Sequence, residues 1–165
     1  MRKTYDRQLK VGQVNIEDIE INLRARDEIP KTLLGIQAVY RNRALMERIF
    51  EILESGISPE IDKNTGRPGM ELWKIFVLGV LRLVCNIDYD RLLELSNEHK
   101  TIRKFLGHSL YDDDRNYALQ TLKDNISRLT PQLLDEINQE IVKFGRNEIF
   151  KKKRKKSKVG VIHIR

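Results

Sequence analysis

The chain has 165 residues and a net charge of +7, which allows one domain with a small appendage and a helical core of moderate size. Its single cysteine, Cys85, excludes an internal disulfide and fits a reducing compartment. The apolar run at residues 76–84 contains Arg82 and is too short to span a bilayer, so we expect a soluble, cytoplasmic protein with no membrane partner.

The positive charge is concentrated at the C-terminal end. Residues 146–165 contain nine Lys or Arg residues and one Glu, a net charge of +8. The first 145 residues contain 22 basic and 23 acidic residues, a net charge of −1. Bulk charge therefore does not mark the body as a nucleic-acid-binding protein, and any DNA affinity there requires a local basic patch.

Residues 1–30 have the least regular pattern. The residues between Asn15 and Leu23 could form a strand, although their apolar positions do not alternate cleanly, or a short helix, and we favour a loosely docked arm. Pro30 precedes one helix over residues 31–54, where apolar residues recur every three or four positions and Gly56 is the stop signal. Residues 58–69 contain two Pro and two Gly and are expected to form a loop.

Residues 66–107 predict three consecutive helices. Pro68 suits a helix start because its missing N–H is unpaired there, and the apolar residues of segment 73–83 cover most of the helix circumference, as in a helix buried on nearly all sides. Asp88 or Asp90 can cap the second helix, which has a leucine face. A third, short helix follows, and the three together predict a helix-turn-helix-like unit within a domain at residues 31–107.

The third helix carries the best candidates for DNA contact in the body. Ile102 and Phe105 are expected to point inward, which leaves Lys100, Arg103 and Lys104 as three cations on the short helix. An ordinary solvent-exposed face is the alternative explanation, and the residues alone give the two readings about equal weight. His99 and His108 flank this helix, and surface histidines without a special role are the favoured interpretation.

Residues 108–145 predict a polar linker followed by two connecting helices. Asn116 can cap a helix over residues 117–128, and Thr130 with Pro131 is a strong start for another over residues 132–144, which Gly145 closes. The acidic triplet at residues 112–114 is best explained as a solvated linker or a helix cap. No phosphate-binding glycine loop, zinc spacing or catalytic serine motif is present, so no metal or catalytic residue is assigned.

Residues 146–165 are expected to be a disordered basic tail. Its six consecutive cations would contact DNA phosphates without sequence preference, through counterion release: Lys151, Lys152, Lys153, Arg154, Lys155 and Lys156. The same run is similar to a nuclear-import signal. The alternative, of about equal weight, is that the tail is translated from a shifted frame of an A-rich stretch of gene. The predicted fold class is therefore mainly α, with a multi-helix domain and a basic tail.

The order of several motifs resembles the N-terminal domain of bacterial insertion-sequence transposases. The matching motifs of the body are Gly66-Arg67-Pro68, the apolar helix that follows, Asp90-Arg91-Leu92-Leu93-Glu94 and Phe105-Leu106-Gly107. Residues 117–145 resemble the connecting helices of the ISNCY group of transposases. The resemblance covers approximately residues 1–145.

The resemblance implies recognition of double-stranded DNA at the terminal inverted repeats of the element. It also implies pairing of two subunits, as a homodimer or as a mixed dimer with a full-length transposase. Arg67 and Arg91 join the three cations of the short helix as DNA contacts, and Arg2, Lys3 and Arg7 are weaker candidates for phosphate contacts. Arg91 has an alternative partner in Glu94 or Glu98.

The catalytic part of such a transposase is not expected in this chain. The family carries an Asp, Asp, Glu triad that binds divalent metal ions such as Mg²⁺, and residues 146–165 contain no Asp. We therefore expect a truncated transposase that needs no cofactor and is inactive alone. The alternative is a helical protein-interaction or regulatory module that does not bind DNA, which the nearly neutral body supports.

Overall fold

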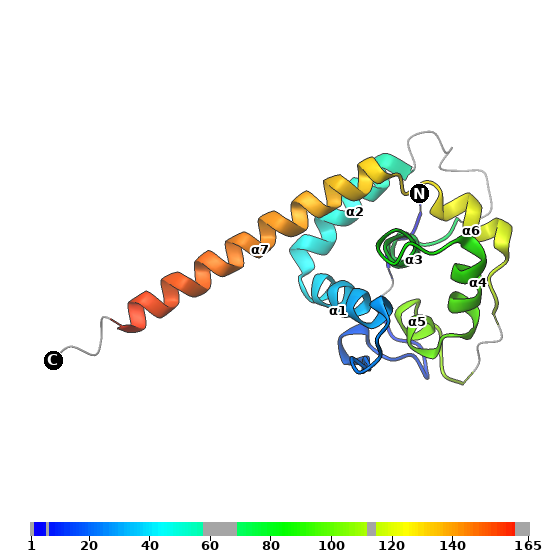
Figure 1. Cartoon of the computed structure of the whole chain (residues 1–165), viewed down its shortest axis with the longest axis horizontal. Coiled ribbons are helices and arrows are strands. Elements are labelled where there is room, and N and C mark those ends of the chain that lie inside the picture. Colours follow the sequence, from blue (N-terminus) through cyan, green and yellow to red (C-terminus); the bar gives the residue numbers. More distant parts are fainter. Residues whose placement is uncertain (1, 6, 58–68, 112–114, 161–165) are drawn as a thin grey trace.

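The computed structural model describes residues 2–5, 7–57, 69–111 and 115–160, without the side chains of residues 149, 150 and 153–160. Within these ranges the chain forms helices and no strands, so the predicted mainly α fold is confirmed. The elements are a 3₁₀ turn, η1 (Ile16–Asp18), and the α-helices α1 (Glu28–Arg41), α2 (Arg43–Ile57), α3 (Leu72–Val84), α4 (Tyr89–Glu98), α5 (Lys100–Phe105), α6 (Leu119–Ile126) and α7 (Pro131–Gly160). Figure 1 shows a compact helical body from which α7 projects.

Helix α3 is the centre of the body, as its apolar pattern predicts. Its side chains from Leu72 to Leu78 are almost entirely buried, apart from Lys74. The indole N–H of Trp73 donates to the carbonyl of Phe105 over 2.7 Å, which ties α3 to the end of α5. The predicted helix start at Pro68 is wrong, because the described residues 69–71 precede the first turn and the helix begins at Leu72.

The predicted single helix over residues 31–54 is two helices, α1 and α2, separated by Asn42. The backbone of Asn42 is extended (φ −96°, ψ 102°), and its side-chain oxygen accepts from the N–H of Leu45 over 2.8 Å. Asparagine competes well as an N-cap because its short side chain satisfies a backbone N–H that the new helix leaves unpaired. The apolar period continues across the break, which is why periodicity alone does not detect it.

The N-terminal arm is docked more firmly than the sequence indicates. Ile16 in η1 is fully buried, and the side-chain amide of Gln37 on α1 donates to the carbonyls of Ile16 (2.8 Å) and Ile19 (3.0 Å). The carbonyls of Lys3 and Thr4 accept from the first two N–H groups of α3 over 2.9 and 3.1 Å. The arm therefore supplies hydrogen-bond acceptors for the first N–H groups of α3, which have no partner within the helix. No local sequence pattern indicates this contact.

The last two helices differ from the prediction at their ends. Helix α6 begins after Ala118 rather than Asn116, because the Tyr117 N–H donates to the Asn97 side chain over 2.7 Å instead of entering a helix. Helix α7 does begin at Pro131, with Thr130 as its cap. The predicted end at Gly145 is wrong, because α7 continues to Gly160.

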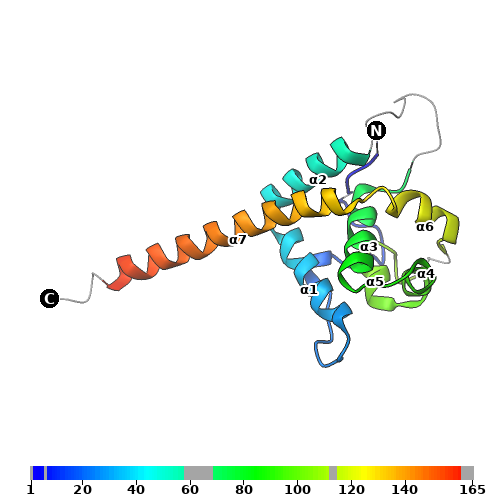
Figure 2. The same ribbon diagram turned by 45° about the horizontal axis from the view of Figure 1, so that its top comes forward.

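The long helix α7 lies antiparallel to α2. Leu133, near the start of α7, packs against Gly56, near the end of α2. Glu140, seven residues later on α7, lies 4.0 Å from Arg48, which is eight residues earlier on α2. This register brings α7 past the first residue of α2, Arg43, near Gly145. Figures 1 and 2 both show α7 running beside α2 and then leaving the body. Gly145 thus marks the end of packing against α2 rather than the end of the helix.

Candidate nucleic-acid interface

The turn between α4 and α5 is built on His99, which ends one helix and begins the next. Its N–H donates to the carbonyl of Leu95 over 3.0 Å, and its Nδ1 accepts from the N–H of Ile102 over 3.3 Å. Burial lowers the pKa of His99 below its ordinary value of 6.5, with the charge of Arg91 acting in the same direction and Asp27 opposing it. The imidazole is therefore a neutral structural cap.

Arg103 on α5 is occupied by the fold. Its guanidinium donates to the carbonyl of Ser96 at the end of α4 over 3.3 Å and to the carbonyl of Arg115 before α6 over 3.0 Å. A guanidinium suits this role because its fixed fork of donors bridges two acceptors in one plane. Arg103 therefore joins three segments of the body, and DNA contact through this residue requires those bonds to break.

The other candidates near α5 differ in accessibility. Lys100 is exposed at the first position of the helix, and Lys104 is half-buried. Arg91 on α4 lies 2.7 Å from Glu94, so the alternative ion pair is the one that the structure contains. Arg67 lies outside the described residues, as do the acidic residues 112–114. Of the four predicted contacts that the structure describes, Lys100 is the one that is exposed and has no ion pair with another described side chain.

The cations of the arm are also partly engaged. The Arg2 guanidinium donates to the carbonyl of Met70 (3.1 Å) and to the side chain of Asn125 (2.7 Å), and burial lowers its pKa. Arg7 lies over the ring of Tyr40 at 5.7 Å. Lys3 is exposed. Arg2 is thus a structural residue that joins the arm to α6, and Lys3 and Arg7 remain candidates for phosphate contacts.

The basic run of the C-terminal segment has helical backbone from Lys151 to Lys156. Lys151 is exposed and lies 3.4 Å from Glu148, one turn earlier, while Lys152 is exposed with no ion pair among the described side chains. The backbone of Lys153, Arg154, Lys155 and Lys156 lies in α7, and their side chains fall outside the described part. The run therefore starts about six residues beyond the end of packing at Gly145.

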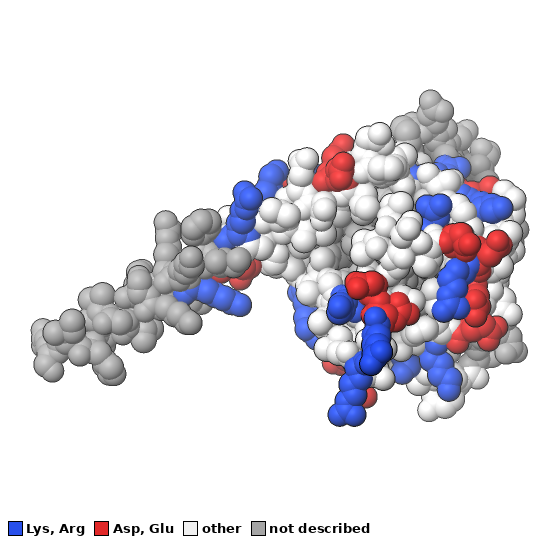
Figure 3. Space-filling view, viewed as in Figure 1, with Lys and Arg blue, Asp and Glu red and all other residues white. Residues whose placement is uncertain are grey.

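The surface charge of the helical body differs from that of the end of α7. On the face shown in Figure 3, basic and acidic side chains are interspersed over the body. Interspersed charges of both signs do not create the extended positive field that attracts a polyanion. A uniformly positive field is expected only where the sequence has cations without acids, which is the end of α7.

One cluster of basic residues could not be predicted from the sequence. Lys10 in the arm, Lys74 on α3 and Arg115 before α6 line the same cavity, although they are more than 40 residues apart in the chain. The arm is brought there by backbone and hydroxyl hydrogen bonds to the segment after α5. Hydrogen bonds between segments so far apart in the chain leave no periodicity and no motif, so the sequence offered no reason to group these residues.

The described residues contain no group of three or more His, Cys, Asp or Glu side chains placed to hold a metal ion. Among the described helices, none has the length and hydropathy required to cross a membrane. When the chain is compared with protein-family models, curated proteins and solved structures, no match is found. The likeness to insertion-sequence transposases therefore rests on the motifs quoted above.

Proposed function

We propose that the chain is a helical DNA-binding domain of the kind that insertion-sequence transposases use to hold the ends of their element. The observation that carries the proposal is α7, a continuous helix that is docked on α2 by its first half and leads six consecutive cations away from the body. The proposed setting is the cytoplasm, and the proposed ligand is double-stranded DNA.

The geometry of α7 suits a duplex. Its 16 residues from Gly145 onward span about 24 Å at the helical rise of 1.5 Å per residue. A free-standing α-helix of this kind fits the major groove, and cations along it release condensed counterions from the phosphates. Docking of the first half on α2 orders the helix before binding, which lowers the entropic cost of association.

The body would supply a second, weaker contact. Lys100 and Lys104 lie on the same short helix and remain the proposed contacts of α5, while Arg103 and Arg91 are assigned to the fold and to the ion pair with Glu94. In this proposal, recognition of the inverted repeat depends on both regions engaging one duplex. Pairing of two chains, or of this chain with a full-length transposase, remains part of the proposal.

The test is the affinity of the purified chain for a fluorescent 30-base-pair duplex, measured by anisotropy at several salt concentrations. Neutralising the six cations of residues 151–156 to Gln is expected to weaken binding at low salt by about 10³-fold or more and to flatten the salt dependence, since each lost phosphate contact removes about 0.9 from the slope of log K against log salt. Unchanged binding, or no binding by the native chain, contradicts the proposal.

A second function, protein interaction through α7, is favoured by one observation. Val142 on the outer side of the docked half of α7 is 47% exposed, beside the half-buried Ile141 and Phe144. An apolar side chain on an exposed helix face suits a partner helix. Sedimentation equilibrium and duplex binding of the native chain and of Val142→Asp separate the two functions. An interaction module self-associates through this face and does not bind the duplex, whereas a DNA-binding domain binds the duplex whether or not it pairs.

A further inference from the structure

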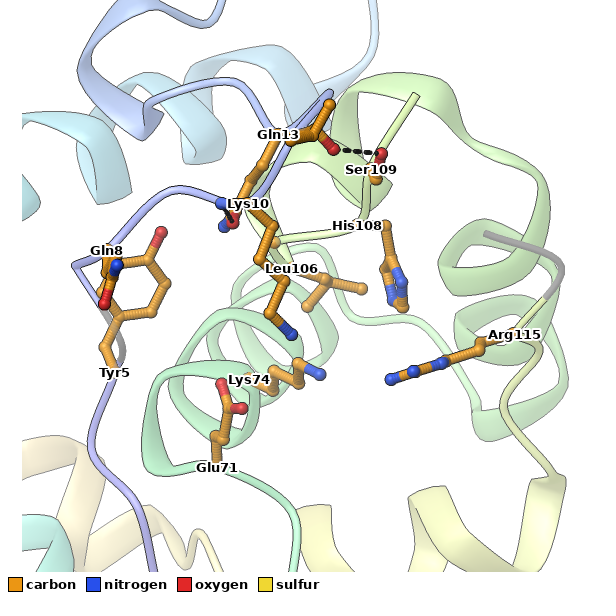
Figure 4. A pocket seen from close by; sticks show the side chains of 12 residues that line it. Tyr5, Gln8, Lys10, Gln13, Glu71, Lys74, Leu106, His108, Ser109 and Arg115 are labelled. Carbon is orange, nitrogen blue, oxygen red and sulfur yellow. Dashed lines mark hydrogen bonds between the residues drawn. The ribbon is translucent and has the colours of Figure 1, made fainter. Parts of the chain in front are cut away.

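A cavity of about 370 Å³ lies between the N-terminal arm, α3 and the segment that follows α5. Figure 4 shows Lys10 reaching into it from the arm, Lys74 from α3 and Arg115 from the far side. Its walls are completed by polar groups that include Gln13 and the buried His108, and by the apolar side chain of Leu106. A volume of this size is at the lower end of the roughly 300–1,000 Å³ of small-molecule sites.

The rim of the cavity is fixed by hydrogen bonds between the arm and the segment after α5. The Ser109 hydroxyl donates to the carbonyl of Val11 over 2.9 Å, and the Leu110 N–H donates to the carbonyl of Gly12 over 2.9 Å. Within the arm, the Lys10 N–H donates to the Gln13 side chain over 3.0 Å. The cavity is therefore shaped by long-range bonds and is more than a gap between loosely placed loops.

Two glycines with left-handed backbone stand at this rim. Gly12 has φ +79° and Gly107 has φ +81°, a conformation that other residues adopt only at a cost. A Cβ on Gly12 would collide with the side chains of Tyr111 and Ser109, and one on Gly107 would lie 3.2 Å from the Gln13 amide nitrogen. Gly12 therefore allows the close approach of the two segments, whereas Gly107 is the left-handed residue that follows the end of α5.

Among the described residues of the lining, Lys10, Lys74 and Arg115 are basic and Glu71 is acidic. Lys74 is half-buried, yet no acidic side chain in the described ranges lies within ion-pair distance of its ammonium group. A bound anion would give Lys74 a partner of opposite charge in the cavity. Lys74 and Glu71 also line an adjacent cavity of about 480 Å³ on the other side of the helix start.

We infer that this cavity binds the phosphate group of a ligand no larger than a mononucleotide. The two lysines, Lys10 and Lys74, supply mobile point charges for the phosphate oxygens. The phosphate belongs either to a free phosphorylated small molecule or to a DNA strand that the body holds. In the second case the inference rests on the proposed DNA-binding function, and in the first it is independent of it.

The test compares AMP with adenosine, which lacks the phosphate, by following the backbone amide signals of the ¹⁵N-labelled full chain at constant ionic strength. AMP is expected to shift the signals of Gly12, Lys74 and Gly107 in a saturable manner, whereas adenosine is not. The double variant Lys10→Gln/Lys74→Gln should weaken AMP binding by at least about tenfold, since it removes two charge-assisted contacts. The matched control, Lys123→Gln, removes an exposed lysine on α6 outside the cavity and should bind AMP normally.

A phosphorylated duplex distinguishes the two sources of phosphate. If the duplex displaces AMP from Gly12 and Gly107, the cavity holds a DNA phosphate, and if it shifts only signals elsewhere, the cavity holds a free small molecule. Both results support the inference. AMP shifts that are absent, that persist in the double variant, or that occur only in α7 overturn it. Because AMP does not require the cations of residues 151–156, this failure is distinct from a failure of the proposed DNA binding.

Discussion

The short helix α5 and the projecting half of α7 both carry clustered cations, but they use them differently. Arg103 on α5 donates to backbone carbonyls of two neighbouring segments, and Ile102 and Phe105 bury the helix against the body. The projecting half of α7 lies beyond the end of α2 and takes its charge from residues 151–156. A run of basic residues is therefore a candidate for DNA contact only where its side chains are not already bonded within the fold.

Two faces of the docked half of α7 extend this comparison and give the largest predicted effect. Ile137 is 1% exposed, and Val142, five residues further along the same half, is 47% exposed. Ile137→Ala should lower the free energy of unfolding by about 2–5 kcal/mol, because it leaves a cavity under the helix. Val142→Ala should change it by no more than about 0.5 kcal/mol. Urea denaturation followed by circular dichroism measures both, and equal losses would contradict the docking of α7 on α2.

Arg103 and Lys100 offer the corresponding comparison within α5. Arg103→Ala should cost about 1.5–3 kcal/mol of unfolding free energy, because the carbonyls of Ser96 and Arg115 lose a charged donor. Lys100→Ala, on the exposed side, should stay within about 0.5 kcal/mol of the native chain. Thermal and urea unfolding of the two variants provide the measurement. If Arg103→Ala keeps full stability and loses DNA affinity, α5 is the DNA reader.

The cap of α5 predicts a smaller, pH-dependent effect. The folded pKa of His99 is below 6.5, so the unfolded chain binds more protons as pH falls, and stability decreases below about pH 7 until the folded pKa is passed. A protonated Nδ1 also cannot accept from the Ile102 N–H. At pH 7.5, His99→Ala should cost about 1 kcal/mol, the usual value of an N-cap.

The conservative variant His99→Asn keeps the capping hydrogen bond but removes the ionisable imidazole. Asparagine accepts the same N–H without titrating, so the part of the pH dependence that belongs to His99 should disappear, while any contribution of His108 remains in both chains. Unfolding free energies at pH 7.5, 6.5 and 5.5 provide the comparison. The same slope in the native and His99→Asn chains would contradict the assignment of His99 as a neutral cap.

The sequence predicted the elements better than their ends. The helices over residues 72–105 follow from local apolar faces and from a capping aspartate, and of the two predicted caps of α4, Asp88 and Asp90, the structure contains Asp88. The break at Asn42 was missed because its side chain caps a new helix although the apolar period continues. The continuation through Gly145 was missed because packing on α2 outweighs one glycine, which is a weak helix former.

The candidate site was less predictable than the fold. The basic residues of α5 were recognised, but the bonds of Arg103 to Ser96 and Arg115 depend on the relative placement of three segments. The cavity with Lys10 and Lys74 depends on an arm that docks through its backbone carbonyls. Side-chain availability and long-range cavities are tertiary properties, and neither charge counts nor local patterns contain them.

The most direct test of the central claim compares two variants that each lose two positive charges. Lys151→Gln/Lys152→Gln should reduce the slope of log K against log salt for a duplex by about 1.8, or roughly 0.9 for each phosphate contact. Lys100→Gln/Lys104→Gln should reduce the slope by clearly less than this, because α5 supplies the weaker contact. The opposite result, a flattened slope for Lys100→Gln/Lys104→Gln and a native slope for Lys151→Gln/Lys152→Gln, would contradict the proposal that the cations of α7 are the main DNA contacts.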